Sequence, residues 1–262
     1  MRKPKLGQVF LIDQNIINKI IQVAALAKSQ HVLEIGCGDG ILTEALAQKV
    51  SQLTVVEIDE NCLVKTQQRC KQFKHIHWVH SDVLALDLDR FDQPVTVVAN
   101  VPYYLSAKLI QWFALNKHKF NLIIIMIQKE FAQKCLVGPG VKAYTSLSVF
   151  TQRHFKVKKL FDITRTCFKP VPNVDSTMIR LEPYQFDLPL EDELFDRIVT
   201  ACFWGKRKKL ATALNKNPFV KFNQDVRNCD PLQDLLTKRA DQLSLKDYVF
   251  VAQQLQHLGF IA

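Results

Sequence analysis

The feature that most constrains this chain is a regular alternation of short apolar segments with helical ones, beginning near residue 31. The apolar segments lie at residues 31–35, 53–58, 75–79, 95–99 and 122–127. Helical stretches lie between them at residues 41–49, 60–71 and 106–115. Strands that alternate with helices at this spacing form a parallel sheet through right-handed crossovers. The pattern therefore predicts an α/β fold, a Rossmann-like sheet with helices on both faces.

The pattern changes after residue 155. Residues 157–163 and 175–182 are predicted strands joined by a loop that contains proline, and the chain then turns helical. We expect the longest helix at residues 191–214 and the last one at 243–258. Pro183 and Pro189 mark a boundary between the two patterns. We therefore predict a catalytic domain at residues 1–183 and a small α-helical C-terminal domain at 184–262.

A glycine-rich segment follows the first predicted strand. Gly36, Gly38 and Gly40 lie between that strand and a helix, where glycine lets the backbone approach a ligand closely. The spacing is GxGxG, whereas nicotinamide-binding loops have GxGxxG. No Lys-Ser or Lys-Thr pair follows the glycines, which disfavours a phosphate-binding P-loop.

Two acidic residues follow the next two predicted strands. Glu57 lies near the end of the second strand, and Asp82 follows the third. Ligands of parallel sheets bind at the carboxyl ends of the strands, where Glu57 can accept hydrogen bonds from ribose hydroxyls and Asp82 from an adenine amine. Taken alone, Glu57 could be a surface acid and Asp82 a helix N-cap. Together with the glycines they predict an adenosyl cofactor.

The fourth predicted strand runs into Asn100-Val101-Pro102-Tyr103. An adenine N6 amine is a poor nucleophile, and it gains positive charge as it is methylated. The side-chain oxygen of Asn100 and the carbonyl of Val101 or Pro102 can accept its two hydrogens and stabilise that charge. Pro102 stiffens the turn, and Tyr103 offers a flat face for the base. The alternative is an ordinary strand-end turn with a packed tyrosine.

A second aromatic residue stands in the stiff segment Phe168-Lys169-Pro170-Val171-Pro172. Two prolines would hold Phe168 in a fixed position, so we predict that it forms a second face for an extruded adenine, opposite Tyr103. The alternative is that Phe168 anchors the loop in the core.

At these residues the chain resembles the KsgA (RsmA) family of ribosomal RNA adenine N6,N6-dimethyltransferases. The resemblance spans nearly the whole chain. It is carried by the segments at 5–11, 34–38, 56–59, 81–82, 100–103, 128–130, 142–149, 168–176 and 203–208. Val9 stands where the family usually has Asn or His, and Cys37 replaces a proline of the family's glycine loop.

The resemblance implies a Rossmann-like methyltransferase that transfers methyl groups from S-adenosylmethionine to two adjacent adenosines in the 3′ terminal hairpin of small-subunit (16S) ribosomal RNA. It implies Asn100, Pro102, Tyr103 and Phe168 as catalytic residues. The expected cofactor-binding residues are Leu11, Gly36, Gly38, Glu57, Asp82 and Asn100. Lys206, Arg207 and Lys208 resemble a basic RNA-binding segment of the family's C-terminal domain.

The charge of the chain agrees with an RNA substrate. The formal net charge is +10, and cations concentrate near the N-terminus, at residues 153–180 and at 206–209. This excess of positive charge favours a polyanionic partner. The seven cysteines have irregular spacing without a CxxC pair, which argues against disulfides and zinc. We expect a cytoplasmic monomer that acts on small-subunit ribosomal RNA or the pre-30S particle and binds neither membrane nor metal.

Two other functions remain open at this point. One is methylation of a large-subunit ribosomal RNA adenosine, as in resistance methyltransferases. The other is a non-catalytic assembly factor on the same fold, against which the intact segment from Asn100 to Tyr103 argues.

Overall fold

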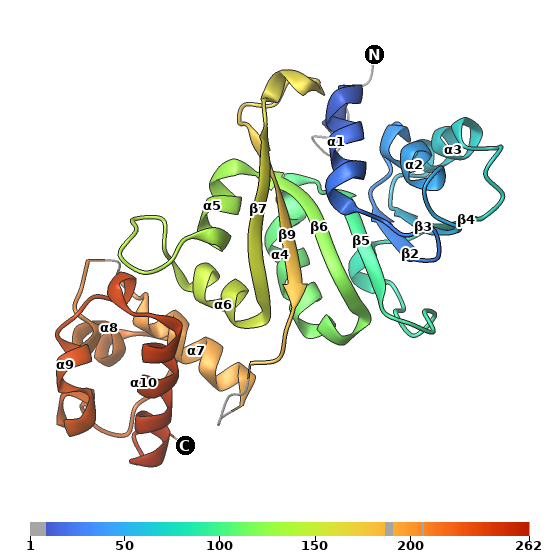
Figure 1. Ribbon diagram of the computed structural model, residues 1–262. Coiled ribbons are helices and arrows are strands. Elements are labelled where there is room, and N and C mark those ends of the chain that lie inside the picture. Colours follow the sequence, from blue (N-terminus) through green and yellow to red (C-terminus); the bar gives the residue numbers. More distant parts are fainter. Residues whose placement is uncertain (1–8, 187–190, 206, 262) are drawn as a thin grey trace. The chain divides into compact units, whose positions relative to one another are not determined.

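The computed structural model describes residues 9–186, 191–205 and 207–261 (Figure 1). Contacts divide the chain into two compact units. The first contains the residues up to Ala132 together with Phe155–Tyr184. The second contains Gln133–His154 and the residues from Gln185 onward. The last part of the second unit, from Gln185, starts close to the expected boundary after residue 183, whereas Gln133–His154 was expected in the catalytic domain.

A seven-stranded sheet forms the centre of the first unit, in the order β4-β3-β2-β5-β6-β9-β7. Neighbouring strands from β4 to β6 are parallel, while β9 and β7 join antiparallel. Their bounds are β2 His31–Ile35, β3 Gln52–Glu57, β4 Ile76–His80, β5 Val95–Asn100, β6 Phe120–Gln128, β7 Phe155–Ile163 and β9 Ser176–Pro183. The expected Rossmann-like sheet is confirmed, because each predicted strand lies within two residues of an observed one.

Helices cover this sheet on both faces. They are α1 (Gln14–Ala24), α2 (Ile41–Ala47), α3 (Glu60–Arg69) and α4 (Ser106–Leu115). From β2 the chain adds strands toward one edge of the sheet, β3 and then β4, and it later adds β5 and β6 toward the other edge. Because the crossovers are right-handed, α2 and α3 lie on one face of the sheet and α4 lies on the other. In Figure 1, α1 passes in front of the strands and α4 lies behind them. The central strands are apolar and buried on both faces, as parallel strands should be.

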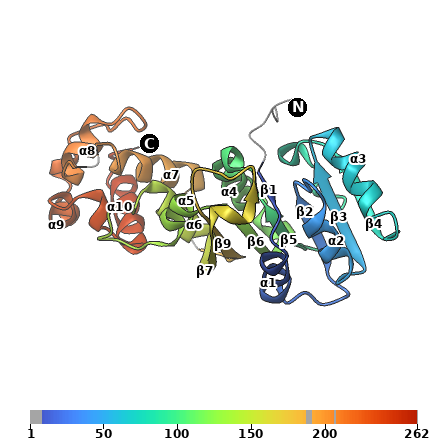
Figure 2. The same cartoon turned by 90° about the horizontal axis from the view of Figure 1, so that it is seen from above.

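A two-stranded ribbon lies beside the sheet. β1 (Phe10–Leu11) pairs antiparallel with β8 (Phe168–Lys169), and Leu11 is opposite Phe168. Figure 2 shows the yellow segment that carries β8 next to β1. This pairing joins the beginning of the chain to a loop more than 150 residues later in the sequence.

The second unit is helical and has its own core. Its helices include α6 (Ser146–His154), α7 (Asp192–Cys202), α8 (Leu210–Lys216), α9 (Gln233–Leu236) and α10 (Leu245–His257). α5 (Lys129–Leu136) spans the division between the units. Phe195, Leu210 and Tyr248 are fully buried in this core. The small helical C-terminal domain is therefore present.

The prediction of one long helix at residues 191–214 is wrong. Gly205 has a φ of +78°, a left-handed conformation that ends the helical path after α7. The backbone N–H of Lys208 then donates to the Gly205 carbonyl at 2.8 Å, which forms a turn before α8. Helix-forming residues on both sides of this turn conceal the break in the sequence.

Candidate active site

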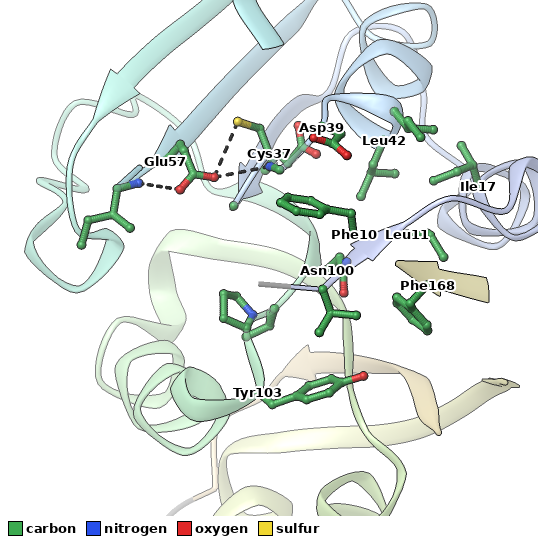
Figure 3. Close-up of a pocket in the computed structure, with 18 of the residues that line it drawn as sticks. Phe10, Leu11, Ile17, Cys37, Asp39, Leu42, Glu57, Asn100, Tyr103 and Phe168 are labelled. Atoms are coloured by element: carbon green, nitrogen blue, oxygen red, sulfur yellow. Dashed lines mark hydrogen bonds between the residues drawn. The ribbon is translucent and has the colours of Figure 1, made fainter. Parts of the chain in front are cut away.

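A pocket opens at the carboxyl ends of β2, β3 and β5 (Figure 3). This is the edge where ligands of such sheets bind. Of the predicted site residues, the pocket wall contains Leu11, Gly36, Gly38, Glu57, Asn100, Pro102, Tyr103 and Phe168. The fold therefore brings together in one place residues that are spread over about 160 positions of the sequence.

The glycine loop forms one side of the pocket. Gly36 and Gly38 have φ values of +77° and +52°, which residues with a side chain adopt rarely. A Cβ on Gly38 would lie 3.1 Å from the Phe10 ring, and one on Gly36 would lie 3.9 Å from the Asn100 carbonyl oxygen. The loop thus exposes bare backbone to the pocket, as close contact with a ligand requires.

Glu57 ties the end of β3 to the glycine loop. One of its carboxylate oxygens accepts hydrogen bonds from the backbone N–H groups of Ile58 and Asp59, both at 2.9 Å. The other accepts from the Gly38 N–H at 3.4 Å, and the Cys37 thiol lies 3.6 Å from it. Only 6% of Glu57 is exposed, so it is not an ordinary surface acid.

Glu34 is a pocket residue that the sequence analysis missed. It is fully buried, and neither carboxylate oxygen has a hydrogen-bond partner among the described residues. Burial raises the pKa of Glu34 to about 8, although the nearby Thr43 hydroxyl acts in the opposite direction, and the Glu57 carboxylate adds to the rise. A charged residue inside the apolar run 31–35 was the signal for it. A buried acid without a partner suits a ligand that carries a cationic group.

Asn100 ends β5 and stands in the pocket wall between Phe10 and Phe168 (Figure 3). No hydrogen bond of its half-buried side-chain amide is found among the described residues. The neighbouring Val101 N–H donates to the Met126 carbonyl at 3.2 Å, which fixes the turn. The turn thus fixes the backbone beside Asn100 and leaves the donor and acceptor atoms of its amide free for a ligand.

Tyr103 is oriented by a residue of β9. Its hydroxyl hydrogen-bonds to Ser176 Oγ at 2.8 Å, and Ser176 is fully buried. Burial raises the pKa of the Tyr103 phenol. The Pro102 carbonyl accepts from the Leu105 N–H at 2.9 Å and so begins a short 3-10 turn. The hydrogen bond to Ser176 therefore orients the tyrosine ring in the pocket wall. Because it is made by the hydroxyl, it does not involve the flat faces of the ring.

Leu11 and Phe168 close the pocket through the paired β1 and β8. Both belong to the apolar core, and Phe168 is only 2% exposed. Phe168 therefore anchors its loop in the core while one part of it faces the pocket. Its expected role in stacking on a base stays a prediction.

Asp82 does not line the pocket. Its carboxylate accepts a hydrogen bond from the Leu84 N–H at 3.0 Å and caps the 3-10 helix Val83–Ala85, and the residue is exposed. The structure thus shows the capping interaction that was the alternative to ligand binding. A contact of Asp82 with an adenine amine stays a prediction.

The predicted RNA-binding residues belong to the second unit. Arg207 and Lys208 are exposed between α7 and α8. Lys206 lies outside the described residues, as do residues 5–8 of the N-terminal segment. In the described part of the chain, no helix is long and apolar enough to span a membrane, and no cluster of at least three His, Cys, Asp or Glu residues could hold a metal ion.

Comparisons with known proteins identify the family to which the chain belongs. Relatives named ribosomal RNA small subunit methyltransferase A include one from Thermotoga maritima, 36% identical over 94% of this chain and 83% of the relative. One from Levilactobacillus brevis is 37% identical over 99% and 92%.

Among solved structures, a dimethyladenosine transferase from Plasmodium falciparum has a TM-score of 0.82 at 27% identity, with 96% of this chain and 99% of that one covered. The 23S rRNA methyltransferase ErmE has a TM-score of 0.70 at 25% identity, covering 94% and 99%. The family model described as ribosomal RNA adenine dimethylase matches residues 1–249. The chain therefore belongs to the ribosomal RNA adenine dimethylase family.

Proposed function

We propose that the chain transfers methyl groups from S-adenosylmethionine to the N6 atoms of two adjacent adenosines in the 3′ terminal hairpin of small-subunit ribosomal RNA. The observation that carries this proposal is the Asn100 amide, which has no hydrogen-bond partner among the described residues, in a pocket lined by the glycine loop, Glu57 and Tyr103. Family membership makes the chain an S-adenosylmethionine-dependent ribosomal RNA adenine dimethyltransferase. The particular adenosines are part of the proposal.

The pocket residues fit S-adenosylmethionine. This cofactor supplies an electrophilic methyl group on a sulfonium, next to an adenosine and a cationic amine. Gly36 and Gly38 would lie against it with bare backbone, and Glu57 would accept hydrogen bonds from its ribose hydroxyls. The buried carboxyl of Glu34 holds its proton up to about pH 8, and a cationic group bound beside it would favour its ionised form and pair with it.

The turn from Asn100 to Tyr103 would hold the target base. Asn100 Oδ1 accepts one hydrogen of the adenine amine, and a backbone carbonyl of the turn accepts the other. The backbone of this turn is fixed before the base arrives, and the two acceptors stabilise the positive charge that develops on the nitrogen. The Tyr103 ring, oriented by Ser176, stacks on the base. No strong general base is needed, because the proton can leave to water after methyl transfer.

Two alternatives are disfavoured. The relatives from Thermotoga maritima and Levilactobacillus brevis carry the small-subunit name, whereas ErmE, a 23S rRNA methyltransferase, is less similar in structure than the Plasmodium enzyme. A non-catalytic assembly factor would have no use for the free amide of Asn100. We further propose that the chain acts as a cytoplasmic monomer on the pre-30S particle.

One experiment separates these functions. Radiolabelled methyl groups of S-adenosylmethionine are offered to the purified chain with small subunits, large subunits or free ribosomal RNA. We expect incorporation into small subunits, at two adjacent adenosines. Incorporation into the large subunit alone would identify the resistance type, and no incorporation would leave only the assembly factor.

A further inference from the structure

An aromatic pair lies on the surface of the second unit, outside the pocket. Trp204 directly follows the C-cap of α7, and Phe219 lies in the loop after α8. Their rings are 5.9 Å apart and nearly perpendicular, at 81°. Trp204 is 41% exposed and Phe219 40%. Neighbouring exposed rings are a common mark of an interaction surface.

The loop holds Phe219 at the surface by polar contacts. Asn217 Oδ1 accepts hydrogen bonds from the backbone N–H groups of Phe219 at 2.8 Å and Val220 at 2.7 Å. The Arg197 guanidinium donates twice to the Phe219 carbonyl, at 2.9 and 3.2 Å. The backbone of Phe219 is therefore fixed from both sides while its ring stays exposed, which is the arrangement of a rigid contact residue.

The same part of the chain is purely cationic. No Asp or Glu occurs between Asp196 and Asp225, whereas this stretch contains Arg197, Lys206, Arg207, Lys208, Lys209, Lys216 and Lys221. The described members of this set are exposed, and none forms an ion pair with a described carboxylate. The side chain of Lys208 lies against Gly205, the residue next to Trp204. Exposed cations without ion pairs, of which Lys208 and Arg197 lie next to the ring-bearing segments, fit a partner with both phosphates and flat bases.

We propose that Trp204 and Phe219 bind an unpaired base of ribosomal RNA by stacking, while the surrounding cations bind its phosphates. This inference rests on the proposed function. Aromatic side chains stack on any base, but they need a base whose face is not covered by duplex neighbours. A lipid surface fits less well, because the apolar part consists of two rings from separate loops, one after α7 and one after α8, and is not the face of an amphipathic helix.

The test measures binding of a short fluorescein-labelled oligoadenylate to the full-length chain by anisotropy. Trp204→Ala and Phe219→Ala should each weaken binding about fivefold to about a hundredfold, the usual effect of losing one stacking platform. Trp204→Phe should retain most of the affinity. Phe250→Ala is the matched control, because Phe250 on α10 is also 40% exposed but lies outside the cationic stretch. Equal affinity of Trp204→Ala and Phe250→Ala would overturn the proposal.

Two further ligands separate stacking from other causes. Inorganic polyphosphate has the charges of RNA without its bases, so Trp204→Ala should bind it as tightly as the wild type does. A loss of polyphosphate binding equal to the loss of oligoadenylate binding would show a general disturbance and contradict stacking. Vesicles of phosphatidylglycerol test the lipid surface. Binding to vesicles that depends on Trp204, with oligoadenylate binding unchanged, would likewise overturn the proposal.

Methyl transfer to small subunits, measured in parallel, keeps the two proposals apart. An active wild type whose Trp204→Ala variant binds oligoadenylate normally would refute only the stacking surface. A wild type that binds oligoadenylate through Trp204 but transfers no methyl group would refute the proposed function and leave the surface in place.

Discussion

At the scale of single residues, the free amide of Asn100 gives the sharpest prediction. Asn100→Ala should lower the single-turnover rate of methyl transfer by about a hundredfold to a thousandfold, the usual cost of losing one preorganised group that stabilises the transition state. Both substrates should still bind, because the contact strengthens as the amine nitrogen becomes tetrahedral. Methyl transfer at the wild-type rate would contradict the mechanism proposed here.

Glu57 tests the cofactor side of the pocket. Glu57→Ala should weaken S-adenosylmethionine binding by about 1–3 kcal/mol, since a charged hydrogen-bonding group is lost. The backbone N–H groups of Gly38, Ile58 and Asp59 also lose their acceptor, so the variant should melt at a lower temperature. Calorimetry of cofactor binding is the measurement. An unchanged affinity would mean that Glu57 only braces the loop.

Glu34 predicts a dependence of stability on pH. Its folded-state pKa of about 8 lies above that of an unfolded glutamate, so the folded state holds a proton that the unfolded state has lost. Stability should therefore fall as pH rises from about 4.5 to about 8, by up to about 1.4 kcal/mol per pH unit from this group. Urea unfolding of the wild type and of Glu34→Gln at several pH values measures this pH dependence of the unfolding free energy. Parallel curves for the two proteins would show that Glu34 does not hold this proton.

The sequence predicted that Glu57 lies in the site, but it did not predict this for Glu34. Glu57 stands at a strand end, where the position of a ligand-binding acid is set by the sheet. Glu34 lies inside an apolar run, and its full burial depends on packing by residues far away in the sequence. Asp82 also follows a strand, but its side chain satisfies the local backbone N–H of Leu84. A position at the end of a strand therefore predicts that a carboxylate lies at the ligand-binding edge of the sheet. It does not predict whether the carboxylate points into the pocket or bonds to the local backbone.

At the scale of elements, the glycine loop joins β2 to α2 through strained backbone. Gly40 has a φ of +80°, and a Cβ there would lie 2.7 Å from Thr66 Cγ2. Gly40→Ala should therefore destabilise the fold by more than the roughly 1–2 kcal/mol of left-handed strain alone. Gly138→Ala is the control, because nothing lies within 4 Å of its added Cβ and its φ is not positive. Equal unfolding free energies of the two variants would contradict this explanation.

The elements show which structures local sequence can specify. Long apolar strands and the last helix, expected at 243–258, were predicted; this helix is α10, which Ser244 and Asp247 begin with a capping box. The ribbon of β1 and β8 was not, because each strand has two residues and its pairing is long-range. The break between α7 and α8 depends on one left-handed glycine, Gly205, which a helical pattern tolerates.

At the scale of the whole molecule, the composition of the second unit could not be predicted. Residues 133–154 precede the last two strands of the sheet in sequence, yet they pack with the helices after 184. Tyr144 and Val149 belong to the same core as Phe195 and Tyr248. A boundary inferred from prolines assumes a continuous domain, whereas here long-range apolar contacts decide the division.

The net charge of +10 leads to the last prediction. Reversing Lys206, Arg207 and Lys208 to Glu should weaken ribosomal RNA binding and leave cofactor binding intact. Each lost phosphate contact lowers the slope of log affinity against log salt by about 0.7–0.9, so the slope should fall by up to about 2–3. The control reverses Lys49, Lys65 and Lys71, three exposed lysines of the first unit, and changes the net charge equally. If both triple variants show the same slope, net charge alone governs binding, and the cluster beside Trp204 makes no specific contact with phosphate.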